Sequence, residues 1–315
     1  PDHNIKRYIM TKYRSNLSAI EKNIFISYVG IETDLIFNRG IDLPGFASYP
    51  LLETQDGRDM LYGYYAKLMD VARHKGVGVL LESPTWVANR DRGAAIGYNS
   101  EYLKNANIAA IELIAQVREN KGDLPTILSA QVGPRDDGYS PREQMTSDEA
   151  EAYHSLQIDI ISKTEADMVG AFTLCYPEEA IGIVRAGKKF GLPVVIAFTV
   201  ETDGYLPTGM PLKYAIEVVD DATNSGAAYF LINCAHPDHF SKILEDEGWV
   251  KRIRGFVVNA SRKSHAELDD SEELDEGDPK ELGELIGAIC KRFPHFTIVG
   301  GCCGTDMRHL KQILE

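Results

Sequence analysis

Two things that the 315-residue sequence lacks narrow its function. No run of apolar residues approaches the roughly 18 that cross a bilayer, and the N-terminal PDHNIKRYIM lacks the apolar stretch of a signal peptide. Basic side chains are also scarce, because 33 Lys and Arg stand against 47 Asp and Glu, for a net charge of −14. Such a surface repels phosphate backbones and anionic lipids. We therefore expect a cytoplasmic protein that binds neither nucleic acid nor membranes.

The sequence also lacks the patterns of two common protein classes. No G-x-G-x-x-G turn follows the first predicted strand, which removes the main support for dinucleotide binding. The five cysteines are an odd number in a large acidic chain without an export signal, and this argues against a disulfide scaffold. What is present is an ordinary globular balance of 44% hydrophobic and 25% charged residues. The cysteines therefore need another role.

Short β-branched segments recur along the chain and predict eight strands, several of them continuous apolar runs typical of parallel strands. Helix-like segments separate them, and the clearest is Pro177–Phe190, with acidic residues first and lysines near its end. Eight such units in about 300 residues predict an α/β fold, a single-domain (β/α)8 TIM barrel over residues 1–315 with residues 1–20 as an N-terminal extension. A doubly wound open sheet is the alternative. The predicted strands are Ile24–Val29, Val77–Leu81, Thr126–Gln131, Met168–Phe172, Val194–Phe198, Ala228–Ile232, Gly255–Val258 and Thr297–Val299.

Two connections are longer than the others, and we expect both to be insertions at the rim of the barrel. Residues 30–76 contain the Pro/Gly-rich stretch IDLPGFASYP before a helix. Residues 261–279 are strongly acidic and follow the seventh predicted strand. This acidic segment is either a solvated surface loop or a loop that covers the site, because barrels place their chemistry at the C-terminal ends of the strands.

Three of the five cysteines directly follow predicted strands. Cys234 comes after the sixth strand in LINCAHPDHF, and Cys302 and Cys303 come after the eighth in VGGCCGTD. In a (β/α)8 barrel both positions lie at the C-terminal rim, so we expect the three thiols to converge. Three thiolates bind Zn²⁺ at about 2.3 Å each and leave a fourth tetrahedral position open, as in catalytic zinc sites. The alternatives for the adjacent pair are two small buried residues or a redox-active vicinal disulfide.

The charge of such a centre indicates its chemistry. Zn²⁺ with three thiolates carries a net negative charge, so it activates water poorly but can still hold an incoming thiol as its thiolate. Alkyl transfer to sulfur fits this property better than hydrolysis does. We expect His236 and His239 to cap a helix or hydrogen-bond near the site rather than bind metal. Cys290 is expected in the core, and Cys175 is left open to a role at the barrel mouth.

The segments around the three cysteines are characteristic in themselves. Asn-Cys in LINCAHP, followed far downstream by Gly-Gly-Cys-Cys-Gly-Thr in VGGCCGT, resembles the homocysteine S-methyltransferase family. Weaker similarities in GIETDLIFNRG, ESPTWVAN, SAQVGP and FVVNAS extend the resemblance over nearly the whole chain. It implies a zinc barrel that binds the sulfur of homocysteine on the metal and methylates it to methionine. The residues that match motif positions, and so imply contacts to the substrate or to the ligand loops, are Thr33, Thr173, Asn233 and Asn259.

The chain departs from the family pattern at the ends of two strands. Members usually have an Asp-Gly pair after the first strand, where this chain has Tyr28-Val29, and a Glu-Thr pair after the fourth, where Phe172 replaces the Glu. The resemblance implies that these carboxylates hold the amino group of homocysteine, and a buried charge without a partner is costly. Either other acids replace them, or the thiol substrate lacks that amine. We expect Glu201 to be the replacement. The other nearby acids are Glu32, Asp34 and Glu82.

The expected function is zinc-dependent methyl transfer from an S-methylmethionine, S-adenosylmethionine or betaine type of donor to a thiol, with homocysteine giving methionine. Aromatic faces stabilise such cationic donors, and Tyr28, Trp86, Tyr176 and Tyr205 lie near predicted strand ends. No folate or cobalamin module fits within 315 residues, so a donor of that kind would need a partner protein to present it. The alternative is a zinc barrel that binds a different thiol or acts with such a partner. The sequence leaves the oligomeric state open, and a homo-oligomer is compatible with it.

Overall fold

The computed structural model describes residues 11–315, and its centre is a closed barrel of eight parallel strands. Each strand pairs with the next along the chain, and β1 closes the ring by pairing with β8, with Phe25 opposite Ile298. Nearly every strand residue is buried, because the barrel interior covers one face and the helices cover the other. This confirms the predicted (β/α)8 barrel and excludes the open sheet. The strands are β1 (Phe25–Ile26), β2 (Gly78–Glu82), β3 (Thr126–Val132), β4 (Met168–Leu174), β5 (Val194–Phe198), β6 (Tyr229–Asn233), β7 (Ile253–Val258) and β8 (Ile298–Gly301).

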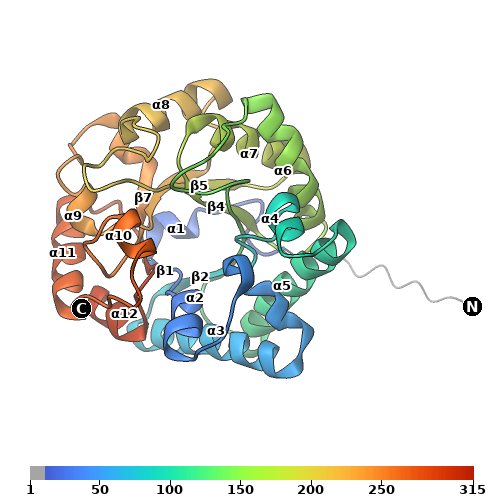
Figure 1. Ribbon diagram of the computed structural model, residues 1–315. Coiled ribbons are helices and arrows are strands. Elements are labelled where there is room, and N and C mark those ends of the chain that lie inside the picture. Colours follow the sequence, from blue (N-terminus) through green and yellow to red (C-terminus); the bar gives the residue numbers. More distant parts are fainter. Residues whose placement is uncertain (1–10) are drawn as a thin grey trace, which may run out of the picture.

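The helices form the outer layer, and Figure 1 shows them surrounding the ring of strands. α7 (Pro177–Phe190) has the predicted bounds, and α8 (Leu212–Thr223) is slightly shorter than the helix that the sequence predicts over Leu212–Ser225. α5 (Ser100–Asn120) begins earlier than the helix that apolar periodicity predicts over Asn105–Glu119, because the Asn99 side chain caps its first turn. The remaining helices outside the rim insertions are α1 (Ala19–Lys22), α3 (Gln55–Lys75), α4 (Arg90–Ala95), α6 (Ser147–Ser162), α9 (Pro237–Phe240), α11 (Pro279–Arg292), α12 (Met307–Ile313) and the 3₁₀ turn η4 (Gly248–Arg252). Across residues 11–315, no helix is both long and apolar enough to cross a membrane.

The first strand is shorter than the predicted Ile24–Val29. Beyond Ile26 the chain keeps two backbone hydrogen bonds to the β8 segment, from the Ser27 amide (2.9 Å) and to the Tyr28 carbonyl (2.8 Å). It then turns at Gly30 into the one-turn helix α2 (Ile31–Thr33). The end of β1 therefore leads directly into the rim.

The described part of the N-terminal extension packs at the opposite, N-terminal end of the barrel. The Arg14 guanidinium donates to backbone carbonyls between residues 162 and 166, and the backbone amides of Lys12 and Tyr13 both donate to Asp167 (2.9 Å each). Asp167 also pairs with Arg118 at 2.8 Å. Residues 1–10 of the predicted extension lie outside the described residues. This network closes the end of the barrel that lies away from the rim insertions.

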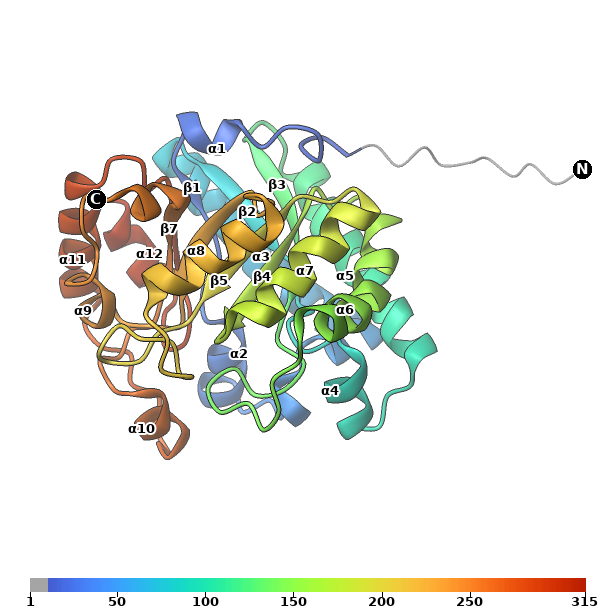
Figure 2. The same ribbon diagram turned by 90° about the horizontal axis from the view of Figure 1, so that it is seen from above.

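Both long connections leave the C-terminal ends of strands and are insertions at the rim, as predicted. The first contains α2, the π-helical turn η1 (Asp34–Asn38) and the 3₁₀ turns η2 (Pro44–Phe46) and η3 (Tyr49–Glu53) before α3. The second lies between β7 and α11 and contains α10 (His265–Asp269). Figure 2 shows α2, α4 and α10 at one end of the barrel and α1 at the other.

One carboxylate is enclosed inside the barrel. Glu82, the last residue of β2, is 1% exposed and accepts a hydrogen bond from Ser27 at 3.3 Å, whereas its Oε2 has no hydrogen-bond partner. Burial raises the pKa of Glu82 to about 7, and the nearby Ser129 and Ser27 hydroxyls oppose that rise. Glu82 is therefore partly protonated near neutral pH.

Candidate active site

A cavity of about 450 Å³ opens at the C-terminal ends of the strands, where (β/α)8 enzymes hold their active sites. Strand ends and both rim insertions contribute side chains to it. Two of its sides differ in character. The cysteine wall consists of Cys234, Cys302, Cys303 and Asn259, and the aromatic wall consists of Tyr28, Phe46, Trp86 and Phe172.

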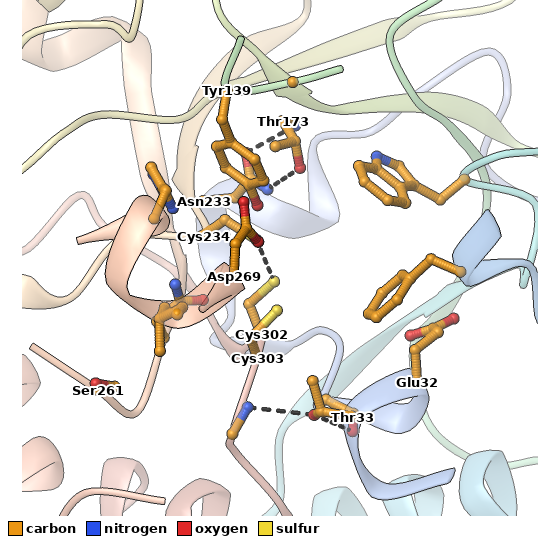
Figure 3. Close-up of a pocket in the computed structure, with 18 of the residues that line it drawn as sticks. Glu32, Thr33, Tyr139, Thr173, Asn233, Cys234, Ser261, Asp269, Cys302 and Cys303 are labelled. Atoms are coloured by element: carbon orange, nitrogen blue, oxygen red, sulfur yellow. Dashed lines mark hydrogen bonds between the residues drawn. The ribbon is translucent and has the colours of Figure 1, made fainter. Parts of the chain in front are cut away.

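The structure brings the three predicted cysteines together. Cys234 directly follows β6, and Cys302 and Cys303 directly follow β8, so their side chains enter the cavity from nearby strand ends (Figure 3). The three sulfurs all lie within 4.8 Å of one another, and those of Cys234 and Cys302 are 2.6 Å apart. Because thiolates bind zinc at about 2.3 Å, one ion can reach all three sulfurs at this spacing.

The backbone holds these cysteines against the strand between them. The amides of Cys234 and Cys302 both donate to carbonyls of β7, at 3.0 and 2.6 Å. Gly304 adopts a left-handed φ of 77°, and a Cβ there would lie 2.6 Å from the Asp275 carbonyl oxygen. Glycine is therefore required where the loop after Cys303 passes the acidic rim insertion.

The electrostatics of the three sulfurs indicate a site built for a cation. Hydrogen bonds from Cys302 and Cys303, and from the Tyr139 hydroxyl, hold the pKa of the Cys234 thiol well below its ordinary value although burial opposes ionisation. The same contacts with Cys234 raise the pKa of the Cys302 and Cys303 thiols. The protein alone thus favours one thiolate and two thiols. A divalent cation would allow all three to ionise, and three soft thiolates are a donor set that suits Zn²⁺.

Thr33 supports the cysteine loop from the other side of the cavity. Its hydroxyl donates to the Gly30 carbonyl at 2.9 Å and accepts from the Gly304 amide at 3.2 Å, as the dashed lines in Figure 3 show. The side chain is buried and lines the cavity. Thr33 therefore ties the first rim insertion to the loop that carries Cys302 and Cys303.

Asn233 joins the ends of β4 and β6. Its Oδ1 accepts from the Thr173 amide at 2.9 Å, and its Nδ2 donates to the Thr173 hydroxyl at 2.8 Å. Thr173 and Cys234 both have left-handed φ angles, 64° and 51°, which are uncommon outside glycine and gather at functional sites. Asn233 and Thr173 thus position the backbone that presents Cys234.

Asn259 lines the cavity and, within residues 11–315, has an amide oxygen without a hydrogen-bond partner. It is 3% exposed and lines the cavity, its backbone amide donates to Ala235 at 3.1 Å, and its Oδ1 has no partner among the described residues. A buried amide oxygen without a hydrogen bond costs about 1–3 kcal/mol. A bound ligand that donates a hydrogen bond would remove this cost.

The acids proposed from sequence lie in different places. Glu201 sits in the turn after β5, where its amide donates to the Tyr205 carbonyl at 2.8 Å, and it is not among the residues that line the cavity. Asp34 forms an ion pair with Arg39 at 3.1 Å and is also absent from the lining. Glu32 is 8% exposed and does line the cavity. The geometry therefore gives no support to Glu201 and brings Glu32 to the site instead.

The acidic segment 261–279 covers part of the site rather than forming a detached surface loop. A capping box between Ser264 and Glu267 starts α10. The ring of His265 lies 4.0 Å from the ring of Tyr139, and its Nε2 is 3.2 Å from the Thr199 hydroxyl. Because Tyr139 also contacts Cys234, this stack holds α10 over the cysteine wall.

The aromatic wall is packed through specific contacts. Trp86 meets Phe46 edge to face, with ring centroids 6.1 Å apart, and its indole N–H donates to the Phe172 carbonyl at 3.1 Å. The Arg92 guanidinium lies 4.9 Å over the Trp86 ring. This wall is largely apolar, and the guanidinium of Arg92 beside it stacks on the Trp86 ring.

Of the four aromatic residues considered from sequence, two reach the cavity and two do not. Tyr28 and Trp86 line it. Tyr176 instead accepts a hydrogen bond from a backbone amide at 3.2 Å, and Tyr205 is 43% exposed. The lining residues that sequence reasoning missed include Phe46, Tyr139 and His265. All three belong to connections between strands and helices, where periodicity carries no signal, and their sole sequence cue is their place in the segments after β1, β3 and β7.

The remaining cysteines and histidines lie outside the cysteine cluster. His236 caps α9 by accepting a backbone amide at 3.2 Å, as expected, and His239 Nε2 contacts a backbone carbonyl at 2.9 Å. Cys290 packs against the hydrophobic core, and Cys175 is buried outside the cavity. Within residues 11–315, Cys234, Cys302 and Cys303 form the one group of three or more such residues with ligand atoms close enough to hold a metal.

A family comparison identifies the class of protein that this barrel and its cysteines define. The sequence matches the homocysteine S-methyltransferase family model over residues 71–315, well over half of the chain. The chain therefore belongs to the homocysteine S-methyltransferase family, which confirms the resemblance of the cysteine motifs, and it is a methyltransferase. No curated protein sequence matches it.

Solved structures with the same fold include the homocysteine methyltransferase MmuM from Escherichia coli. Its oxidized form is 17% identical, with a TM-score of 0.70 over 94% of this chain and 97% of MmuM. The metallated form is 16% identical with the same TM-score over 93% and 95%. The apo form, also 16% identical, has a TM-score of 0.62 over 92% and 94%. At these identities the likeness supports the fold.

Proposed function

We propose that this protein methylates the sulfur of homocysteine to give methionine, with a Zn²⁺ ion held by Cys234, Cys302 and Cys303. The observation that carries the proposal is the convergence of three sulfurs within 4.8 Å in the wall of a cavity large enough for two small substrates. Family membership supplies the reaction class. The partners in this reaction are small molecules, a thiol and a methyl donor.

The cysteine set suits a zinc ion because sulfurs are soft donors. The protein alone does not ionise all three, since the pKa values of the Cys302 and Cys303 thiols are raised. When bound there, the ion would supply a Lewis acid that keeps an incoming thiol ionised near neutral pH, where a free thiol is mostly protonated. The protein's own contribution is to fix the three ligands through the β7 hydrogen bonds and to hold α10 over them.

The neighbouring polar residues divide into supports and contacts. Thr33, Thr173 and Asn233 make their hydrogen bonds within the protein, and we assign them to positioning the ligand loops. Asn259 lines the cavity and has an amide oxygen without a partner in the described part of the chain, and we assign it to a polar group of the substrate. Apolar side chains of the aromatic wall exclude water from the reacting sulfur.

For the donor, we propose a cationic sulfonium or quaternary ammonium compound of the S-methylmethionine, S-adenosylmethionine or betaine type. Aromatic faces attract such cations, and Trp86, Phe46 and Phe172 provide them. Asp137, Asp269 and other lining acids add negative charge. The ionised thiol would attack the methyl carbon in line, and a carbon–sulfur bond would form. The bond from that carbon to the donor's sulfur or nitrogen would break, and its electron pair would stay on that atom, which leaves without its positive charge.

A second candidate function has one observation in its favour. Tyr28 and Phe172 occupy the strand ends where the family resemblance implies carboxylates. A barrel altered there could bind a different thiol, or could act on a methyl group that a partner protein presents. It would hold zinc but form no methionine from homocysteine and a free donor.

One experiment separates these functions. The protein is purified without chelator, its zinc content is measured, and it is incubated with homocysteine and each of the three donor types. Stoichiometric zinc together with methionine from a free donor supports the first proposal. Zinc without methionine supports the second candidate, and absence of zinc would favour redox chemistry at the cysteine pair.

A further inference from the structure

Glu32 is a buried carboxylate in the wall of the cavity that the proposed mechanism leaves unused. It belongs to the one-turn helix α2, which begins directly after the β1 end. Its side chain faces the cavity while only 8% of its surface is exposed. Figure 3 shows it on the same helix as Thr33, across the cavity from Ser261.

Glu32 is held in place by neutral groups alone. The Ser48 hydroxyl donates to Oε1 at 2.8 Å, and the Tyr28 hydroxyl donates to Oε2. Among the described side chains, no Lys, Arg or His pairs with this carboxylate, and Arg92 of the same cavity stacks on Trp86 instead. Burial raises the pKa of Glu32, and the two hydrogen bonds oppose that rise. The site therefore orients a carboxylate but leaves its charge uncompensated.

Glu32 and the three cysteines line the same cavity. Tyr28, whose hydroxyl donates to Glu32, lines it as well. The remaining atoms of a thiol bound at the cysteines would therefore lie in space that this carboxylate borders. In homocysteine the α-ammonium group is three carbon atoms away from the sulfur, so it is the part of the molecule that needs such a partner.

We propose that Glu32 accepts the α-ammonium group of the thiol substrate, and that it thereby selects amino-acid thiols over thiols without an amine. Ser48 and Tyr28 act as positioning residues that fix the two carboxylate oxygens. The ammonium supplies the missing positive charge, and its hydrogen bonds to a buried carboxylate are of the strong, charge-assisted kind. This inference rests on the proposed function in taking a thiol as the methyl acceptor.

The test compares two thiols and two proteins by calorimetric binding, with no methyl donor present. Zinc-loaded wild type and Glu32→Gln are each titrated with homocysteine and with 4-mercaptobutanoate, which lacks only the amine. We expect Glu32→Gln to weaken homocysteine binding by about 10- to 100-fold, the range for losing a hydrogen bond to a charged group. Binding of 4-mercaptobutanoate should change by less than about twofold, because it makes no contact with Glu32 through an amine.

Two further variants keep the inference open to refutation. Glu32→Asp retains the charge on a shorter side chain, so its preference for homocysteine over 4-mercaptobutanoate should fall less than that of Glu32→Gln. If Glu32→Gln loses zinc, Glu32→Asp replaces it in the test, and a preference at least about threefold below that of wild type would support the inference. Glu201→Gln tests the acid that the sequence favours. A larger loss of homocysteine affinity in Glu201→Gln than in Glu32→Gln would overturn the inference.

The failure of this inference is distinguishable from the failure of the proposed function. Suppose that wild type binds homocysteine but that Glu32→Gln weakens the binding of both thiols equally, or of neither thiol. The role of Glu32 is then refuted, and the proposed thiol site remains. If zinc-loaded wild type binds neither thiol, the proposed function fails, and the inference fails with it.

Discussion

The cysteine wall and the aromatic wall of the cavity face the same space but are built in opposite ways. The cysteine wall has three ionisable sulfurs on loops fixed by backbone hydrogen bonds to β7. The aromatic wall has ring contacts and one indole hydrogen bond, and its strand ends carry Tyr28 and Phe172. The first wall carries the cysteines of the family motif, and the second carries Tyr28 and Phe172 where the resemblance implies carboxylates.

This difference separates two tasks. Under the proposed function, the cysteine wall would determine how a thiol sulfur is activated, and that chemistry tolerates little change because it depends on three converging donors. The aromatic wall would determine which molecules surround that sulfur, and such recognition can be rebuilt with other side chains in the same cavity. The chain could then retain the reaction of its family while its substrate contacts move, as we propose for Glu32.

Breaking the cysteine wall should have the largest effect. Cys302→Ala removes one of three ligands, so we expect the purified protein to lose its zinc and methyl transfer to fall by more than about 100-fold. Loss of a mere supporting contact to a metal ligand costs roughly 10- to 100-fold, and loss of the ligand itself should exceed that. Metal analysis and a methionine assay on the same preparation measure both effects.

Cys290→Ala is the matched control for this variant, because Cys290 packs against the core from α11, away from the cavity. It should retain zinc and activity. Stoichiometric zinc in Cys302→Ala would show that the ligand set has been assigned wrongly.

Glu82 tests whether the barrel interior beside the aromatic wall serves stability rather than substrate recognition. A Cβ on Gly170 would lie 2.7 Å from the Phe172 ring and 3.1 Å from Glu82 Oε2, so both side chains lie beside Gly170. The folded-state pKa of Glu82 is about 7 against an ordinary 4.5, so between these values the folded protein binds more protons than the unfolded chain. Its contribution to the free energy of unfolding therefore falls by as much as about 3 kcal/mol as the pH rises from 4.5 to 7.

Glu82→Gln removes this titration, and we expect a flatter dependence of unfolding free energy on pH and a gain in stability at about pH 8. Urea unfolding at several pH values measures it. Glu112→Gln, at an exposed position on α5, should leave the profile of the wild type intact. A Glu82→Gln profile as steep as that of wild type would place the pH dependence elsewhere, and a raised KM for the thiol would make Glu82 a substrate contact.

The extent to which sequence predicts this molecule also differs between the two walls. The strands could be predicted because buried parallel strands are continuous apolar runs, and Cys234, Cys302 and Cys303 could be placed because each follows such a run directly. A residue that follows a strand in a (β/α)8 barrel has its location determined by topology. The fold and the convergence of the cysteines therefore needed no tertiary information.

The other side chains that line the cavity could not be placed in this way. Glu201 also comes soon after a strand, β5, and is expected at the rim for that reason, yet the turn that contains it leaves it out of the cavity. Glu32 and Tyr139 reach the cavity from loops whose paths depend on contacts distant in sequence, such as Ser48 to Glu32 and His265 to Tyr139. Loop conformation is set by such contacts and not by local periodicity.

Asn259 sharpens the comparison with the smallest expected effect, because it stands on the cysteine wall but is assigned to recognition. Asn259→Ala removes one hydrogen bond to the substrate, so we expect KM for the thiol to rise by up to about tenfold with kcat and zinc content nearly unchanged. A loss of zinc would instead make Asn259 a support for the ligand loops, like Thr33 and Asn233.

Asn259→Asp then shows which atom of the amide is used. The Oδ1 of Asn259 is the atom without a partner, so a substrate that donates to it should bind Asn259→Asp far better than Asn259→Ala. A substrate that instead accepts from Nδ2 should bind Asn259→Asp no better than Asn259→Ala, because a carboxylate has no N–H to donate. Steady-state KM values for the three proteins separate these outcomes, and the second would place an acceptor group of the substrate, such as a carboxylate, at the cysteine wall.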